Sequence, residues 1–245
     1  VEINTNMRLG TDFTIQSLKN EGYEAIFIGI GAPLGTKLNI PGESADGVID
    51  ALAFLREYNI RGSVPVGQDV VIIGGGNAAI DAARTSVRLG AKSVTVLYRR
   101  TRAEMPAYEE EVIEAEHEGV RLETLASPIE IVTKDGKVTA VKCRRMTLGD
   151  FDRSGRRRPV AGKEGEFVVK ADQVIAAIGQ KMDAAHDIGT DLIHINKSGF
   201  IDSDPATGKT SVNWIFAGGD AVLGPASVVE AIAAGERAAI GIDTF

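Results

Sequence analysis

The chain has 245 residues, of which 44% are hydrophobic and 25% are charged, and this is the composition of an ordinary globular protein. Its length allows one large α/β domain or two smaller ones. The net charge of −7 offers no broad cationic surface, which argues against nucleic acid and against an anionic membrane as partners.

Cysteine usage and the pattern of apolar residues indicate the cellular setting. Cys143 is the only cysteine, so the chain by itself can form neither a disulfide nor a cysteine-ligated iron–sulfur cluster. No apolar run approaches the ~20 residues that span a bilayer, and the first residues lack the features of a signal peptide. We expect a soluble protein in a reducing, cytoplasmic setting.

The first 67 residues predict a small αβ unit that is followed by linkers. Apolar side chains at Phe13, Ile15 and Leu18 indicate a short helix over 12–20, and the run over 25–30 is typical of a buried strand. Prolines and glycines mark linkers on either side of a further helix. These elements are the linker over 32–47, the helix over 48–58 and the linker over 62–67.

Strands and helices alternate in the next part of the chain. Strands are predicted over 69–73, 93–98 and 120–125, and helices over 78–89 and 105–118. This alternation is typical of a parallel sheet with crossover helices.

The pattern changes after Ser127. Segments 129–134, 137–146 and 167–169 alternate like antiparallel strands, with turns at Asp135-Gly136 and over 153–158, so we predict a β-meander. Buried strands and an alanine-rich helix then close the chain. These last elements are the strands over 172–178 and 215–217 and the helix over 227–239.

A glycine motif joins the strand over 69–73 to the helix over 78–89. Gly74-Gly75-Gly76-Asn77-Ala78-Ala79 has the G-x-G-x-x-A form of a dinucleotide fingerprint, and it stands where a strand meets a helix. Gly74 permits the sharp turn, Gly76 lets the backbone approach a pyrophosphate, and the amides at the helix start hold the negative charge. The candidate ligands here are Gly74, Gly75, Gly76, Asn77 and Ala78.

The end of the next strand indicates which coenzyme binds. A protein that binds NAD carries an acidic residue there, but this chain has Arg99 and Arg100, which lie 20 and 21 residues after Ala79. Guanidinium groups suit a 2′-phosphate. We therefore predict NADP(H), with Arg102 as a third candidate ligand; a solvated turn is the alternative interpretation of all three arginines.

A second cofactor site is predicted near the C-terminus. Gly219-Asp220 follows the buried strand over 215–217, and Gly224-Pro225-Ala226 leads into the last helix. An aspartate at a strand end can accept a hydrogen bond from a ribityl or ribose hydroxyl, and a helix start can face a flavin carbonyl or a phosphate. The candidates are Gly219, Asp220, Ala226 and Ser227.

Other chemistry is less favoured. The three histidines have no neighbouring ligand set, so no metal site is predicted. Glutamates over 109–118 are interpreted as a solvated helix face, and arginines over 153–158 as an exposed turn that could also dock an acidic partner. No serine has the setting of a hydrolase nucleophile. The histidines are His117, His186 and His194.

Six motifs together resemble the small (beta) subunit of NADPH-dependent glutamate synthase and its relatives among the FAD- and NADPH-binding reductases of the pyridine nucleotide-disulfide type. The resemblance covers nearly the whole chain. The motifs are Ile40-Pro-Gly-Glu43, Gly74-Gly-Gly-Asn-Ala-Ala-Ile-Asp81, Tyr98-Arg-Arg100, Glu104-Met-Pro106, Ala177-Ile-Gly-Gln180 and Gly219-Asp220 with Gly224-Pro-Ala226.

The resemblance implies an α/β fold in which a Rossmann-like NADPH-binding domain, with a parallel sheet and a β-meander, is inserted into an incomplete FAD-binding domain. The FAD-domain remnant with its linker would cover 1–67, the NADP(H) domain 68–171, and the rest of the FAD domain 172–245. Crossings at 29–32 and 177–180 would place Gly179 and Gln180 beside a cofactor. Asp220 would hold the FAD ribityl chain, and hydride would pass from NADPH to the flavin without a catalytic side chain.

Two departures from this pattern matter. A first G-x-G-x-x-G motif for FAD and a cysteine-rich region for iron–sulfur clusters have no counterpart before Gly74. We therefore expect an excised segment that keeps NADP(H) affinity, binds FAD weakly or not at all, and lacks hydride transfer by itself. The resemblance implies a larger catalytic or electron-accepting partner subunit. A ferredoxin–NADP oxidoreductase-type or pyrimidine-reductase-type subunit, or a non-catalytic NADP(H)-binding module, remains the alternative.

Overall fold

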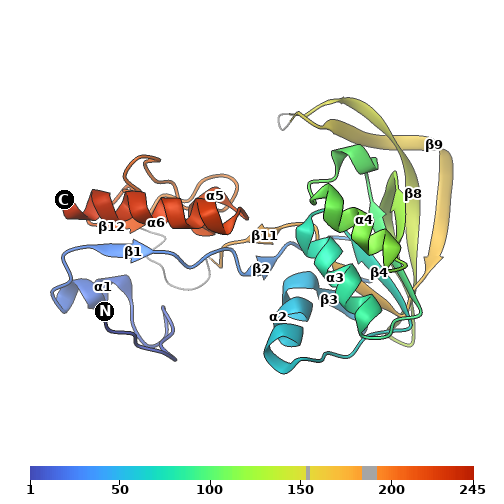
Figure 1. Ribbon diagram of the computed structural model, residues 1–245, viewed down its shortest axis with the longest axis horizontal. Helices are drawn as coiled ribbons and strands as arrows, with labels where there is room; N and C mark the ends of the chain where they lie inside the picture. The colour runs from blue at the N-terminus through green and yellow to red at the C-terminus, as the bar shows by residue number, and fades with distance from the viewer. Residues whose placement is uncertain (153–154, 184–191) are drawn as a thin grey trace. The chain divides into compact units, whose positions relative to one another are not determined.

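The computed structural model describes residues 1–152, 155–183 and 192–245, and the chain forms two compact units. One unit combines Val1–Leu34 with Gly179–Phe245, and the other is Gly35–Ile178. The second unit is thus inserted between two segments of the first (Figure 1).

A five-stranded parallel sheet forms the centre of the inserted unit, in the order β3-β10-β4-β5-β6. Its outer strand β3 and its second strand β10 come from residues that the sequence analysis grouped with the flanking domain. Residues 35–67 and 172–178 belong to the inserted unit because these two strands pair in its sheet. The strands are β3 (Val48–Asp50), β10 (Gln173–Ala176), β4 (Asp69–Ile73), β5 (Ser93–Tyr98) and β6 (Arg121–Thr124).

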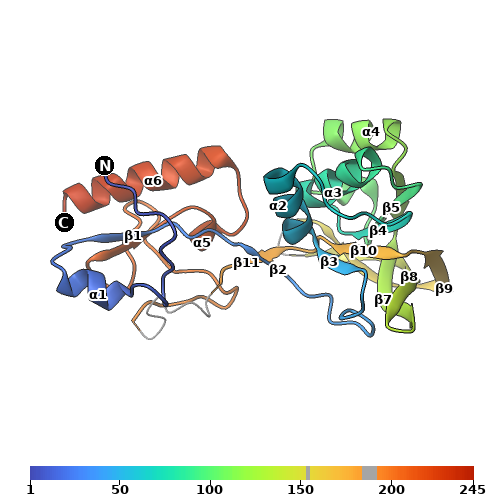
Figure 2. The same cartoon turned by 90° about the horizontal axis from the view of Figure 1, so that it is seen from below.

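Each face of this sheet has its own apolar core. In β4, Val70 and Ile72 pack with the helices α2 (Ala51–Arg61), α3 (Asn77–Arg88) and α4 (Glu109–His117). Val71 and Ile73, which point to the opposite face, pack with the meander. The two layers lie on opposite sides of the sheet in Figure 2. Burial on both faces explains why the strands are continuous β-branched runs.

Two predicted helices begin later than expected. The segment over 48–58 starts as strand β3, and α2 follows after Asp50, whose carboxylate accepts hydrogen bonds from the amides of Leu52 and Ala53. The segment over 105–118 is helical only from Glu109. A short 3-10 helix, η1 (Arg102–Glu104), precedes it, and Met105 is extended, as is usual for a residue before proline.

The predicted meander is an antiparallel sheet of three strands, β7 (Ala126–Lys134), β8 (Lys137–Phe151) and β9 (Arg157–Lys170). Asp135 and Gly136 form its first turn with positive φ angles of 51° and 78°. β9 is much longer than the predicted 167–169. The prediction fell short because this edge strand is largely exposed and its apolar residues do not alternate with polar ones. Arg153, in the second predicted turn, lies outside the described residues. Cys143 of β8 is fully buried, and burial raises the pKa of its thiol to about 12.

The smaller unit is built on the parallel pair β1 (Ile26–Ile28) and β12 (Ile215–Ala217). Helix α1 (Ile15–Asn20), the short α5 (Asp220–Leu223) and α6 (Val228–Asp243) accompany this pair. Strands β2 (Leu34–Gly35) and β11 (Gln180–Lys181) pair where the chain leaves and re-enters the unit. Among the described residues, no helix is long and apolar enough to cross a lipid bilayer.

Candidate dinucleotide sites

The three glycines between β4 and α3 meet different surroundings. A Cβ on Gly74, whose φ is +148°, would lie 2.2 Å from the carbonyl oxygen of Ala177. One on Gly75 would lie 2.5 Å from ring carbons of Tyr98, whereas for Gly76 the nearest atom is 3.8 Å away. The first two glycines are therefore required by contacts within the protein. The third leaves free space in front of the backbone, as the close approach of a ligand requires.

The start of α3 offers unpaired amides beside this space. Gly76 is the N-cap residue, and no side chain caps the helix. Its carbonyl accepts from the amides of Ala79 and Ile80, but in the described part of the chain the amides of Gly76, Asn77 and Ala78 donate to no acceptor. Unpaired amides at the start of a twelve-residue helix attract an anion such as a pyrophosphate.

The structure separates the roles of the three arginines that follow β5. Arg99 is exposed, and its guanidinium has no partner among the described residues. Arg100 is only 5% exposed; its Nε donates to the carbonyl of Arg157 at 2.7 Å, and its terminal nitrogen pairs with Asp152 at 2.7 Å. Arg102 pairs with Glu116 at 2.6 Å. Of the three, only Arg99 is thus exposed with a guanidinium that has no partner in the described part of the chain, as a ligand of a 2′-phosphate would need.

Loss of the Arg100 side chain should destabilise the inserted unit. Arg100→Met leaves the carboxylate of Asp152 without its buried partner, and we expect the free energy of unfolding to fall by about 3 kcal/mol. Arg102→Met removes a half-exposed pair and should cost less than about 1 kcal/mol. Denaturant unfolding of both variants measures the difference. Equal unfolding midpoints would show that the Arg100 pair is not structural.

The segment between Arg100 and α4 is fastened to the glycine turn. Ala107 donates its amide to the carbonyl of Gly75 at 3.1 Å, and Tyr108 donates its amide to Oδ1 of Asn77 at 3.0 Å. The Tyr98 hydroxyl donates to the carbonyl of Glu104 at 2.7 Å. Sequence reasoning placed Asn77 among the cofactor ligands and missed this contact, because its partner is 31 residues away and carries no motif.

The smaller unit holds a cavity of about 320 Å³ that brings together four of the other predicted residues. Asp220 Oδ1 accepts from the amide of Ala226 at 3.2 Å, and the Ser227 hydroxyl caps α6 by accepting from the amide of Glu230 at 3.2 Å. The lining residues are Phe27, Gly29, Gly31, Gly218, Gly219, Asp220, Ala226, Ser227, Val228, Ala231 and Gly235.

Glycines give this cavity the character of a nucleotide cradle. A Cβ on Gly31 or on Gly235 would meet no atom within 4 Å, and one on Gly219 would meet only Ala231, at 3.7 Å. Gly31 was expected only as part of the crossing over 29–32, and Gly235 was not expected at the site, since neither stands in a recognised ligand motif. The other two predicted residues, Gly179 and Gln180, are not among the residues that line the cavity; Gln180 lies in β11. The residues present fit part of a flavin dinucleotide.

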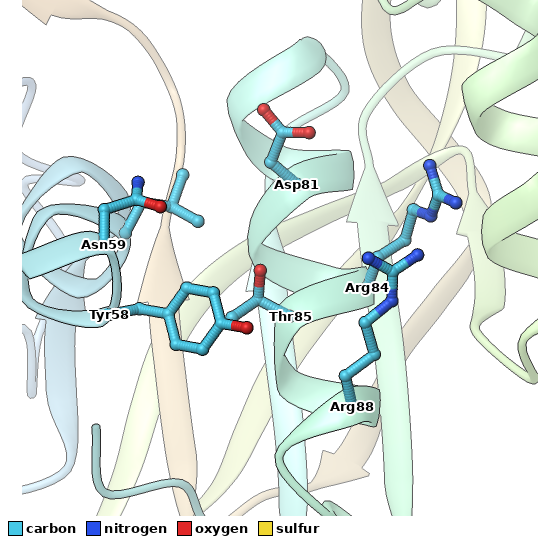
Figure 3. Close-up of a pocket in the computed structure, with 7 residues that line it drawn as sticks. Tyr58, Asn59, Asp81, Arg84, Thr85 and Arg88 are labelled. Carbon is cyan, nitrogen blue, oxygen red and sulfur yellow. The ribbon is translucent and has the colours of Figure 1, made fainter. Parts of the chain in front are cut away.

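A second hollow, of about 280 Å³, lies between α2 and α3 and is lined by no predicted ligand (Figure 3). Tyr58 and Asn59 face it from α2, and Asp81, Arg84 and Arg88 from α3. Both arginines are engaged with α4 or the residue after it. Arg84 pairs with Glu111 and, at 2.8 Å, with Glu118, which also binds Arg88 at 2.6 Å.

The pKa shifts beside the hollow follow from these ion pairs and from burial. Hydrogen bonds from Arg88 and Arg84 hold the pKa of Glu118 below its usual value. Burial, followed by repulsion from Glu111, raises the pKa of Asp81. The arrangement joins α3 to α4. Nowhere in the described ranges does a group of three or more histidine, cysteine or acidic side chains form a possible metal site; His186 lies outside these ranges.

A glycine turn between a parallel strand and a helix defines a dinucleotide-binding α/β protein, and here the described residues leave the amides at the start of the helix and the arginine after the next strand without partners. Comparison with known proteins agrees, because residues 5–235 match the pyridine nucleotide-disulphide oxidoreductase family. The chain belongs to this family. The resemblance drawn from the six motifs is confirmed, and the family is one of oxidoreductases.

The similarity to curated relatives extends over nearly the whole chain. It is 44% identical to the NADP(+)-dependent formate dehydrogenase subunit beta of Moorella thermoacetica, over 100% of this chain and 35% of that protein. It is 38% identical to the NADPH-Fe(3+) oxidoreductase subunit beta of Geobacter sulfurreducens, over 98% of this chain and 39% of the relative. The glutamate synthase [NADPH] small chain of Escherichia coli is also 38% identical, over 99% and 54%. The chain therefore spans about a third to a half of these proteins.

Solved structures confirm the fold class. FprA of Mycobacterium tuberculosis, in complex with NADPH, matches with a TM-score of 0.81 and 22% identity, over 97% of this chain and 67% of that chain. Thioredoxin reductase of T. acidophilum matches with a TM-score of 0.69 and 23% identity, over 90% and 65%. The predicted α/β architecture with a parallel sheet is correct.

Proposed function

We propose that this chain is the NADP(H)-binding part, with a portion of the FAD-binding part, of an oxidoreductase subunit that passes electrons from NADPH through FAD to a partner subunit. Two features of the inserted unit carry the proposal: the uncapped amides at the start of α3, and the exposed guanidinium of Arg99, which has no partner within the ranges that the structure describes. The first suits a pyrophosphate, and the second suits the 2′-phosphate that distinguishes NADPH from NADH.

The cavity of the smaller unit supports FAD as the acceptor of hydride. When bound, a flavin accepts two electrons as hydride and can release them one at a time, so no acid or base side chain is required. The part of this chain is to orient the ligand: Asp220 presents a carboxylate at the end of β12, and the open glycines Gly31, Gly219 and Gly235 allow close approach.

Relatives support a partner subunit as the final acceptor. Two of the three are named as beta subunits and one as a small chain, and their names refer to different reactions. The proposal therefore includes an electron-accepting partner without choosing among acceptors. A ferredoxin–NADP oxidoreductase-type or pyrimidine-reductase-type role stays within the same proposal.

Titration of the chain with NADPH and with NADH tests the proposed coenzyme. We expect NADPH to bind at least ten times more tightly, on the order of the difference that one charge-assisted contact makes. Anaerobic addition of NADPH to the protein as it is made in the cell, loaded with FAD, should bleach the visible flavin band. Equal binding of the two coenzymes would contradict the assignment of NADP(H), and binding without bleaching would favour a non-catalytic nucleotide-binding module.

A further inference from the structure

Residues 99–108 connect two anion-binding features of the inserted unit. The segment begins with Arg99, whose guanidinium is exposed and unpaired as far as the described residues go, and ends at Tyr108, whose amide donates to the side chain of Asn77. Within it, a capping box joins Thr101 to Glu104, and the Tyr98 hydroxyl holds the carbonyl of Glu104. Through these bonds, the part of the segment near Asn77 is connected to Tyr98 and Thr101, which lie on either side of Arg99 and Arg100.

The far end of the segment is hydrogen-bonded to the glycine turn at two points. One hydrogen bond joins main-chain atoms, from the amide of Ala107 to the carbonyl of Gly75, and a side-chain substitution leaves it in place. The other is the 3.0 Å bond from the amide of Tyr108 to Oδ1 of Asn77, the first residue of α3. The Asn77 oxygen therefore accepts a hydrogen bond from within the protein, although Asn77 stands in the middle of the dinucleotide motif.

We propose that Asn77 is a positioning residue for coenzyme selectivity: its side chain holds the segment 99–108 against the glycine turn and so sets Arg99 at the correct distance from the amides of α3. This inference rests on the proposed function. The pyrophosphate and the 2′-phosphate of NADPH are joined covalently at a limited separation, so both can be bound together only if their two sites are held apart by a matching distance. NADH has no 2′-phosphate and gains nothing from this arrangement.

Dissociation constants of Asn77 variants for NADPH and NADH test the inference. In Asn77→Ala the segment loses its hydrogen bond to the side chain at position 77. The affinity for NADPH should then fall between about threefold and tenfold. The affinity for NADH should change less, so that the NADPH/NADH selectivity ratio falls. In Asn77→Asp a carboxylate still accepts from Tyr108. The charge of this carboxylate, beside the amides at the start of α3, should weaken the binding of both coenzymes by a similar factor and leave the selectivity ratio unchanged.

A residue that merely touched the pyrophosphate would behave differently. Asn77→Ala would then lower the affinities for both coenzymes by one common factor, and that result would overturn the inference, as would unchanged affinities. In an Arg99→Ala background, we expect Asn77→Ala to leave the ratio where Arg99→Ala alone put it. A further fall would show that Asn77 acts independently of Arg99. Wild-type protein without a preference for NADPH would instead contradict the proposed function.

Discussion

Replacing Arg99 by alanine should weaken NADPH binding by about 10- to 100-fold and leave NADH binding within about twofold of the wild type. The guanidinium is exposed and lacks a partner in the described part of the chain, so its removal breaks no internal contact. Only a ligand that carries a 2′-phosphate loses an interaction. Calorimetric titration at low and high salt measures the effect, which should shrink as salt screens the exposed charge.

A matched control and a charge reversal make this result sharper. Arg61→Ala removes an exposed arginine of the same unit, on α2, whose partner is Glu57 at 2.5 Å, and it should change neither affinity. Arg99→Glu should weaken NADPH further than alanine does, because a carboxylate repels the phosphate. The assignment of Arg99 fails if its loss affects NADPH and NADH equally, or affects neither.

Gly74→Ala should abolish binding of both coenzymes and lower the free energy of unfolding by about 3 kcal/mol. The added methyl would lie 2.2 Å from the carbonyl oxygen of Ala177, which is backbone and cannot rotate away, and the φ of +148° is unfavourable for any L side chain. Denaturant unfolding and coenzyme titration of one preparation measure both effects.

Gly76→Ala is the matched control for this substitution. Gly76 has an ordinary φ of −93°, and its added methyl would meet no atom closer than 3.8 Å, so the unfolding midpoint should stay near the wild-type value. Coenzyme binding should nevertheless weaken, because the methyl fills the space in front of the unpaired amides. If Gly74→Ala and Gly76→Ala unfold alike, the packing of Gly74 on Ala177 is not what the turn requires.

Local patterns predicted the strands and the turn well, because their cause is local. The β-branched run over Asp69–Ile73 is buried on both faces, and the glycine motif after it marks the turn into α3. Short or edge elements were harder to predict. Val48–Asp50 is too short to be distinguished from the helix that follows it, and β9 lies mostly in solvent without an alternation of apolar side chains.

The roles of individual side chains depended on contacts between distant residues. Arg99 and Arg100 are neighbours in sequence, and nothing local indicates that Arg100 is buried against Asp152, 52 residues further on. Asn77 likewise meets Tyr108 only because the segment after β5 returns to the start of α3. The motif located the candidate site, but packing decides which of its members remain available to a ligand.

The position of β10 has a consequence for biosynthesis. This strand is the last of its sheet along the chain, yet it lies between β3 and β4, to both of which it is hydrogen-bonded. While the ribosome is still adding the meander, β10 does not yet exist, so no strand lies between β3 and β4. The sheet can be completed only after residue 176 has emerged from the ribosome. Nascent chains that stall earlier would expose two unpaired strand edges, which are sites of aggregation and of recognition by chaperones.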